Sequence, residues 1–157
     1  MTDARFEDGG EGPLRLIAQD VEDLKVISTL VQDAVLPVTE MTFDARRRRF
    51  ALFLNRFRWE DRTEAEAVGR AYERVRSLLV VEDVRKVQSM GFDRADKDLV
   101  LSLLSISFAP GEDGTGRLTL VLAGDGAIAL DVEALDVRLD DVTRPYRAPS
   151  GKVPRHE

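Results

Sequence analysis

The hydrophobic pattern of this chain changes its period once, and that change most limits the folds open to it. Before Pro37, apolar residues recur at spacings of three and four through Leu24, Ile27, Val31 and Ala34, which is typical of one face of an α-helix. After Pro37, apolar and polar residues alternate in most segments, and a period of two indicates β-strands. One helix followed by many strands predicts an α+β protein, mainly antiparallel β-sheet, with one N-terminal amphipathic helix.

The residues that flank the helical segment indicate where the helix begins and ends. We expect it over about residues 20–34, with Asp20 as the N-cap, since an aspartate there accepts hydrogen bonds from N–H groups of the first turn. Glu22 and Asp23 follow, and the helix dipole favours acids in that turn. Pro37 is expected to close the helix, because proline disfavours its continuation.

Alternating and continuously apolar segments predict the strands of the sheet. These segments are residues 14–17, 38–43, 50–59, 75–81, 84–90, 99–108, 118–123, 127–130 and 135–139. Residues 44–49 and 124–126 are expected to form the turns of two hairpins. Residues 60–72 are charged and rich in alanine, which predicts either a loop or a short helix capped by Thr63.

The chain also contains an internal repeat. A shift of 49 positions aligns residues 31–61 with residues 80–110 without a gap. The identical pairs are Val31 and Val80, Val35 and Val84, Val38 and Val87, Met41 and Met90, Phe43 and Phe92, Asp44 and Asp93, Leu52 and Leu101, and Leu54 and Leu103. Each copy predicts a strand, a turn and a second strand, so we expect two related β-hairpin units. Chance similarity of two amphipathic hairpins is the alternative, and the sheet could stay open or close partly into a barrel.

We expect one domain with a tail at each end. A length of 157 residues suits a single domain with a sizeable core. Residues 1–12 are acidic and rich in glycine, and they predict a disordered tail because they have too few apolar side chains to offset the entropy of ordering. Residues 13–142 would form the α+β domain. Residues 143–157 hold prolines and scattered cations and predict an extended basic tail.

Two residue types that serve many enzymes are almost absent. The chain has no cysteine and one histidine, and this residue, His156, lies next to the C-terminal end of the sequence. Disulfides, thiolate metal sites and cysteine nucleophiles are excluded, and triads that need a rigidly held imidazole are disfavoured. The sequence contains no phosphate-binding glycine loop and no calcium-loop pattern. We therefore expect no cofactor and no metal site, and no catalytic residue can be named.

The net charge disfavours general nucleic-acid binding. Lys and Arg number 23 against 29 Asp and Glu, which gives a formal charge of −6, whereas proteins that bind the phosphate backbone are usually basic. The exception is a run of four arginines, from Arg46 to Arg49, at the expected tip of a hairpin. This run indicates either a solvated turn or a patch for phosphate, nucleic acid or an anionic membrane surface.

The segment at residues 50–59 holds the best candidate site, made of Asn55, Arg56, Arg58 and Trp59. Two arginines at this spacing share one face of a strand and can bind a carboxylate or phosphate together, while Asn55 orients the ligand and Trp59 stacks on it. The plainer alternative is that both arginines pair with acids of neighbouring strands on a solvated face and that Asn55 is a hydrogen-bonded core amide. The first half of this strand is apolar on both faces, so we expect both faces to be covered there.

Several short motifs resemble those of a known family. They are Gln32-Asp33-Ala34, Arg49-Phe-Ala-Leu52, Leu54-Asn-Arg-Phe57 and Trp59-Glu60. Together they resemble a family of small, uncharacterised bacterial proteins, mostly from alphaproteobacteria, described only as a domain of unknown function. The resemblance covers most of the chain apart from its tails. It implies a stand-alone protein of the bacterial cytosol, and it carries no activity that could be transferred.

Taken together, these features favour a non-catalytic binding or adaptor protein of the bacterial cytoplasm with an unidentified protein partner. One alternative is a small-molecule binder or enzyme that acts on an anionic metabolite held by Arg56 and Arg58. A third is weak binding of nucleic acid through the run from Arg46 to Arg49. The longest mostly apolar segment, residues 99–109, is interrupted by serines and is too short to cross a bilayer, so we expect no membrane association.

Overall fold

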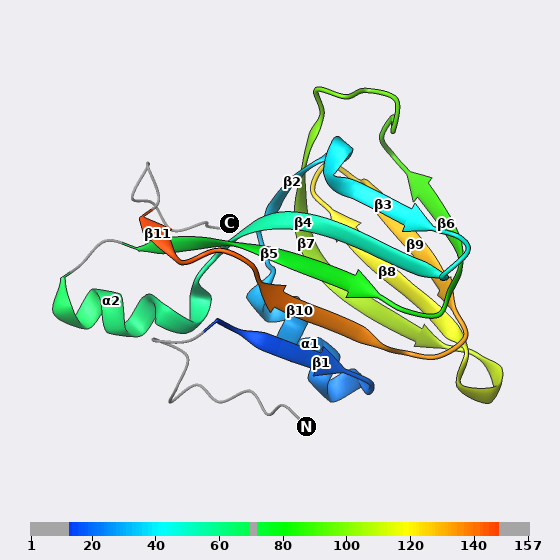
Figure 1. Cartoon of the computed structure of the whole chain (residues 1–157), viewed down its shortest axis with the longest axis horizontal. Helices are drawn as coiled ribbons and strands as arrows, with labels where there is room; N and C mark the ends of the chain where they lie inside the picture. Colours follow the sequence, from blue (N-terminus) through cyan, green and yellow to red (C-terminus); the bar gives the residue numbers. More distant parts are fainter. Residues whose placement is uncertain (1–12, 70–71, 148–157) are drawn as a thin grey trace.

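The computed structural model describes residues 13–69 and 72–147 (Figure 1). Its elements, in chain order, are β1 (Arg15–Ala18), α1 (Val21–Leu30), β2 (Val35–Pro37), the 3₁₀ turn η1 (Val38–Glu40), β3 (Met41–Asp44), β4 (Arg49–Phe57), η2 (Trp59–Asp61), α2 (Arg62–Val68), β5 (Glu73–Val81), β6 (Val84–Met90), β7 (Val100–Pro110), η3 (Glu112–Gly114), β8 (Gly116–Leu122), β9 (Ala127–Val132), β10 (Val137–Asp141) and β11 (Tyr146–Arg147). The expected tail at residues 1–12 and the last part of the expected basic tail, residues 148–157, lie outside the described residues. Tyr146 and Arg147, which the sequence placed in that tail, pair with β5 instead.

The strands form one open antiparallel sheet that folds over into two layers. Eleven strands of the described residues take part, in the order β1-β10-β5-β4-β2-β7-β8-β9-β6, with β3 paired to β4 and β11 to β5. Figure 1 shows β3, β4 and β5 in front of β7, β8, β9 and β6. Strand β2 joins the layers, because it pairs with β4 at Asn55 and with β7 over residues 100–102. The predicted α+β class with a mainly antiparallel sheet is confirmed.

Helix α1 covers an edge of β7 that β2 leaves unpaired. The predicted cap is confirmed, since the Asp20 carboxylate accepts a hydrogen bond from the Asp23 N–H at 2.8 Å. Further along, the backbone N–H of Ile106 in β7 donates to the Ser28 hydroxyl at 2.9 Å. The helix ends at Leu30, because the chain then turns to hydrogen-bond with β7. The expected end near residue 34 is therefore wrong, and so is the role of Pro37, which lies within β2.

Apolar side chains from both layers and from α1 share one core. Its members include Leu16, Leu24, Ile27, Leu52, Leu54, Leu79, Leu103, Leu118, Leu120, Ile128, Leu130 and Leu139. Burial of each such side chain stabilises the fold by about 1.5–3 kcal/mol. In β4, Leu52 and Leu54 point into this core and Phe53 points outward with 38% of its surface exposed. The expectation that both faces of this strand are covered is therefore wrong at Phe53.

The internal repeat does not correspond to two hairpins. In the first copy β3 and β4 do form a hairpin, with Asp44 opposite Arg49. In the second copy β6 pairs with β9 and β7 pairs with β8, so β8 and β9 lie between the two strands. The prediction of a second hairpin is wrong. The shared alternation indicates which residues face the core, but it does not determine which strand is the neighbour.

Two further segments differ locally from the sequence expectations. The single strand expected at residues 38–43 is divided between the 3₁₀ turn η1 and β3. The short helix allowed at residues 60–72 is present as α2, but it begins after Asp61 rather than at Thr63. It ends at Gly69, whose φ of 69° lies in the left-handed region that suits glycine. None of the helices in the described ranges has the length and apolar character needed to cross a bilayer.

Candidate functional site

Arg56 lies at the centre of a buried network of charges. It is 0% exposed, although it comes from the same strand as the outward-facing Phe53. Its two terminal nitrogens donate to Glu60 at 2.9 and 2.8 Å, and Nη2 also donates to both oxygens of Asp141 at 3.0 Å. Its Nε donates to the Ser77 hydroxyl at 3.1 Å. Every nitrogen of the guanidinium is therefore already hydrogen-bonded within the protein.

Arg58 is held in the same way. It is 4% exposed and donates a hydrogen bond to Glu73. Its guanidinium also lies 3.6 Å from the Asp61 carboxylate and 3.8 Å from that of Glu60. We refer to Arg56 and Arg58 together with Glu60, Asp61, Glu73 and Asp141 as the buried ion cluster. Since four carboxylates surround two guanidinium groups, this region does not attract an anionic ligand.

Burial and pairing act in opposite directions on the acids of this cluster. Burial alone would raise the pKa of Glu60, but hydrogen bonds and charge attraction from Arg56 outweigh it, so the pKa of Glu60 lies below its usual value. The carboxylate of Glu60 therefore stays ionised at neutral pH. The cluster holds the end of β4 against η2, β5 and β10, which is a structural role.

Arg56 and Arg58 were expected to share one face of a strand, and this expectation is wrong because the strand ends between them. Strand β4 ends at Phe57, and Arg58 has φ −81° and ψ 77°, outside the regular strand conformation. The alternation of faces stops there, so both side chains can be buried. Pairing with acids, the plainer alternative, is present, but the pairs are buried rather than solvated.

Trp59 links the end of β4 to the turn after α1 by a hydrogen bond. Its indole N–H donates to the backbone carbonyl of Gln32 at 3.0 Å. Its ring meets the ring of Phe57 edge to face, with centroids 4.7 Å apart and planes at 60°. Such pairs contribute about 0.5–1.5 kcal/mol beyond the area they bury. The indole N–H is already used inside the protein, and the ring packs against the core.

Asn55 is the one predicted site residue that lines an open surface. Its side-chain oxygen accepts a hydrogen bond from Nε of Arg74, and its amide group donates to the Tyr146 hydroxyl. Nη2 of Arg74 also donates to the Asn55 carbonyl at 3.0 Å. Burial lowers the pKa of Arg74. Asn55 is thus oriented by residues from β5 and β11, and it is half-buried rather than in the core.

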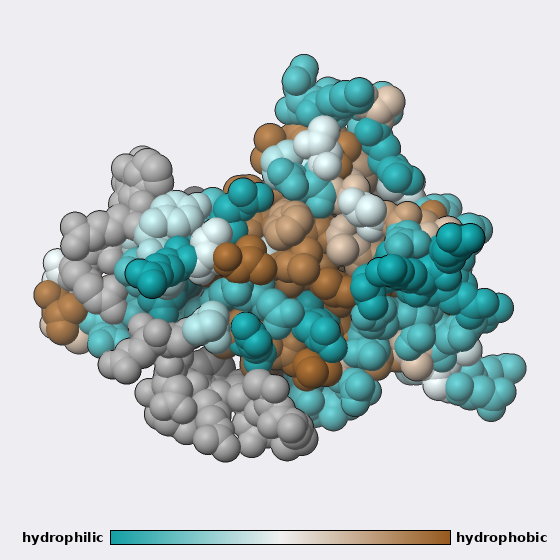
Figure 2. All heavy atoms as spheres, in the orientation of Figure 1, coloured by the Kyte–Doolittle hydropathy of each residue, from teal (hydrophilic) through white to brown (hydrophobic). Residues whose placement is uncertain are grey.

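Beside Asn55 lies an apolar hollow on the outer surface, which we call the apolar groove. It has a volume of about 380 Å³ and is lined by Val35, Pro37, Glu40, Phe53, Leu54, Asn55, Arg76 and Val100. Val100 is 58% exposed and Val35 is 38% exposed. Figure 2 shows hydrophobic side chains gathered at the centre of this face. The groove forms where β2 meets β4 through a single residue pair and η1 then carries the chain away.

A cation and an acid stand on the rim of the apolar groove. The Arg76 guanidinium carbon lies 5.7 Å from the centroid of the Phe53 ring, within the range of a cation–π contact. Its nearest carboxylate in the described ranges is that of Glu40, at 3.9 Å, and the two side chains are 48% and 37% exposed. An exposed pair of this kind contributes at most about 1 kcal/mol. Arg76 can therefore exchange Glu40 for the carboxylate of a ligand.

Sequence reasoning did not find the apolar groove. Its lining comes from β2, β4, β5 and β7, and the pairing of β2 with β7 joins residues far apart in the chain. The one local signal was Phe53, an aromatic residue in the same row as the polar Asn55. A polar residue in such a row is typical of a face that is only partly covered, whereas we expected both faces of the first half of this strand to be covered.

The two-layer antiparallel sheet, the helix on its edge and the buried ion cluster define an α+β protein with a structural charge network and an open apolar groove. Over residues 14–156 the chain matches the family described as "Protein of unknown function (DUF2948)". The chain belongs to this family, and the resemblance to an uncharacterised family is confirmed. Neither a curated protein nor a solved structure matches the chain.

Proposed function

We propose that the protein is a non-catalytic binding module and that its apolar groove takes an extended segment of a partner protein. The observation that carries this proposal is the exposure of Val35, Phe53 and Val100 around one hollow. Contiguous exposed apolar side chains on a soluble surface mark interaction sites more often than isolated ones do. The location that goes with this proposal is the bacterial cytoplasm.

The lining of the groove indicates the chemistry of the segment. Phe53 and Val100 offer an apolar floor for one or two aliphatic or aromatic side chains. Arg76 at the rim would pair with an acidic residue of the segment, in place of its loose contact with Glu40 at 3.9 Å. Asn55 would bind the backbone of the segment, because an amide can both donate and accept. A volume of about 380 Å³ lies at the lower end of the range for ligand pockets.

Site-specific photo-crosslinking in living bacteria tests the proposal. A photoreactive amino acid replaces Val100 in the groove, and the matched control carries it at Val142, which is 47% exposed and outside the groove. We expect a discrete heavier adduct from position 100 that position 142 does not form. Mass spectrometry of the adduct identifies the partner, which is then purified for direct titration.

The titration decides whether the groove is the binding site. We expect Phe53→Ser to weaken binding of the purified partner, with no comparable effect from Val142→Ser. An adduct made of two copies of this chain would replace the proposal with self-association. No adduct at position 100, or equal adducts at both positions, would contradict it.

A further inference from the structure

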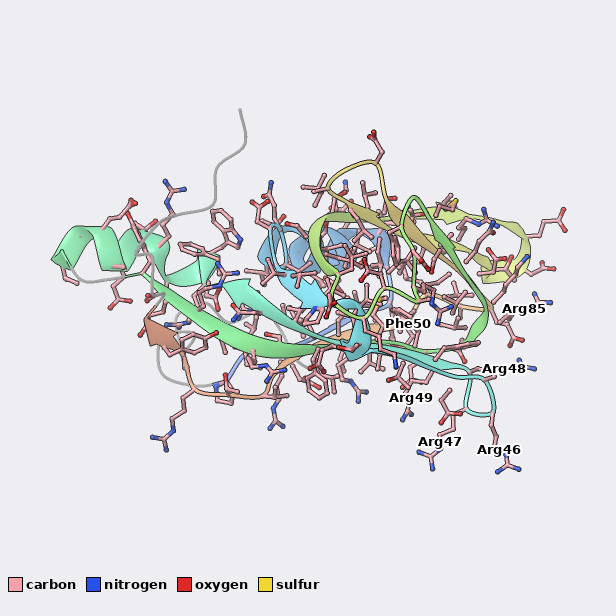
Figure 3. All side chains as sticks on the ribbon, turned by 90° about the horizontal axis from the view of Figure 1, so that it is seen from above. Arg46, Arg47, Arg48, Arg49, Phe50 and Arg85 are labelled. Atoms are coloured by element: carbon pink, nitrogen blue, oxygen red, sulfur yellow. The ribbon has the colours of Figure 1, made fainter. Side chains whose placement is uncertain are left out.

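One end of this acidic protein is basic. Figure 3 shows the side chains of Arg46, Arg47 and Arg48 at the tip of the β3–β4 hairpin, and Arg85 from the start of β6 at the same end of the molecule. Arg48 and Arg85 share one acid: Arg48 donates a hydrogen bond to Glu133, and the Arg85 guanidinium lies 3.9 Å from the same oxygen. Two exposed arginines thus share a single carboxylate on this part of the surface.

Beyond Arg85 lies a second hollow, which we call the basic cavity. It has a volume of about 670 Å³, and its charged lining residues are Arg85, Lys86, Arg117 and Asp131. Three of them lie in one row across the sheet, because Asp131 of β9 is opposite Lys86 of β6 on one side and Arg117 of β8 on the other. Neighbouring strands lie about 4.7–4.9 Å apart, so the charged side chains of Lys86, Asp131 and Arg117 start from adjacent positions on the sheet.

The wall of the basic cavity is built from small residues. Gly111, Thr115 and Gly116 line it beside the cations. At Gly116 a Cβ atom would lie 2.4 Å from the ring of Phe108 and 2.6 Å from the Ala109 carbonyl oxygen. Only glycine fits there without a shift of the chain. The glycine at this position is therefore required by the close packing of the Phe108 ring and the Ala109 backbone.

The charges in the cavity favour an anion. Among the described lining residues, Arg85, Lys86 and Arg117 face one acid, Asp131, and Arg85 also lies 3.9 Å from Glu133 outside the lining. Arg117 and Asp131 lie 2.9 Å apart with side chains 50% and 36% exposed, and an exposed pair of this kind contributes at most about 1 kcal/mol. Within the described ranges no carboxylate lies within 4.0 Å of the Lys86 ammonium group. A phosphate dianion can therefore bind to Lys86 and compete with Asp131 for Arg117.

We propose that the basic cavity binds a small phosphorylated molecule, with one phosphate held by Arg85 and Lys86 and a further contact from Arg117 when it leaves Asp131. Arginine binds phosphate oxygens through two parallel N–H donors, and lysine binds them as a point charge. A hollow of about 670 Å³ has the size of a small-molecule site. Among the residues that the structure describes, no aromatic residue lines it, and these residues therefore offer no stacking platform of the kind found in proteins that bind single-stranded nucleic acid. The site uses β6, β8 and β9 and is independent of the apolar groove.

Calorimetric titration of the full-length protein with inorganic tripolyphosphate at low salt tests this proposal. The site variant is the double substitution Lys86→Gln and Arg117→Gln. The charge-matched control is Arg62→Gln with Arg47→Gln, which removes two exposed arginines outside the cavity. Circular dichroism confirms that both variants are folded.

We expect wild-type protein and the control to bind one tripolyphosphate per chain, and the site variant to bind it at least about tenfold more weakly. No binding by the wild-type protein, or an equal loss in the control, would overturn the proposal. A titration with a single-stranded oligonucleotide distinguishes nucleic acid from a small phosphorylated molecule as the ligand. If the oligonucleotide binds, tripolyphosphate does not, and Arg46→Gln weakens the binding, the basic end is a nucleic-acid surface and the small-molecule site is wrong.

Discussion

Replacement of Arg56 by methionine removes the centre of the buried ion cluster and leaves its acids in place. Glu60 and Asp141 have side chains that are 4% and 5% exposed. Asp141 would lose its cation, and Glu60 would keep only Arg58 at 3.8 Å, both with little access to water. Removal of one partner from a buried pair costs about 3–5 kcal/mol. Asp141 keeps its hydrogen bonds from Ser77 and from the Leu14 backbone. We therefore expect the lower end, a loss of about 3 kcal/mol in the free energy of unfolding.

Urea unfolding followed by circular dichroism measures this loss. A domain of this kind has a free energy of unfolding of about 5–15 kcal/mol, so the Arg56→Met variant should still fold and unfold at lower urea. The matched control is Arg49→Met, because Arg49 pairs with Glu82 at 3.0 Å while 44% and 23% exposed. We expect the control to lose clearly less stability than Arg56→Met, because solvent screens an exposed pair.

The comparison between the two variants can refute this reasoning. If Arg56→Met costs no more than Arg49→Met, the buried pairs contribute no more than an exposed pair. The carboxylates of Glu60 and Asp141 would then tolerate the loss of Arg56 at no large cost, which contradicts the expected penalty of an unpaired buried carboxylate.

Three other predictions concern stability. The folded-state pKa of Glu60 lies below its usual value, so the unfolded chain binds more protons in acid. The contribution of Glu60 to the free energy of unfolding is therefore complete above about pH 5, and it falls as the pH drops below about 4.3 and through the lowered pKa. Urea unfolding at a series of pH values across this range measures it, and a stability that does not change with pH would contradict it. Gly116→Ala places a Cβ atom 2.4 Å from the Phe108 ring and should cost about 1–3 kcal/mol. Gly126→Ala, whose nearest side-chain contact is 3.4 Å, is the control in the same thermal melts, and equal melting temperatures would argue against the clash. Asp20→Ala removes the cap of α1 and should cost about 1 kcal/mol in urea unfolding, and no change would show that the cap does not stabilise the helix.

Local features of the fold were predictable from the sequence. Asp20 and the apolar residues at helical spacing predicted α1 because a cap and a hydrophobic face involve only neighbouring residues. The turn at residues 124–126 likewise predicted the β8–β9 hairpin. The order of strands was not predictable in this way. The pairing of β2 with β7, and the separation of β6 from β7, depend on contacts between distant segments.

In the candidate site, too, contacts between distant segments were not predictable from the sequence. The sequence singled out Asn55, Arg56, Arg58 and Trp59 as one group, and the structure separates Asn55 from the rest. Arg56 is buried because Asp141, 85 positions further along the chain, meets it. No rule based on neighbouring residues indicates such a partner. The apolar groove was missed for the same reason, since its walls come from four strands.

The position of Trp59 makes it an intrinsic fluorescence probe of the fold. It is the single tryptophan of the chain. Its indole N–H donates a hydrogen bond at 3.0 Å to the carbonyl of Gln32, which lies just before β2. Its fluorescence therefore reports on one place, the junction from which β2 reaches into both layers. Val35, three residues beyond Gln32, lines the apolar groove. A ligand that moves β2 would shift the emission of a residue that it does not touch, without any attached dye.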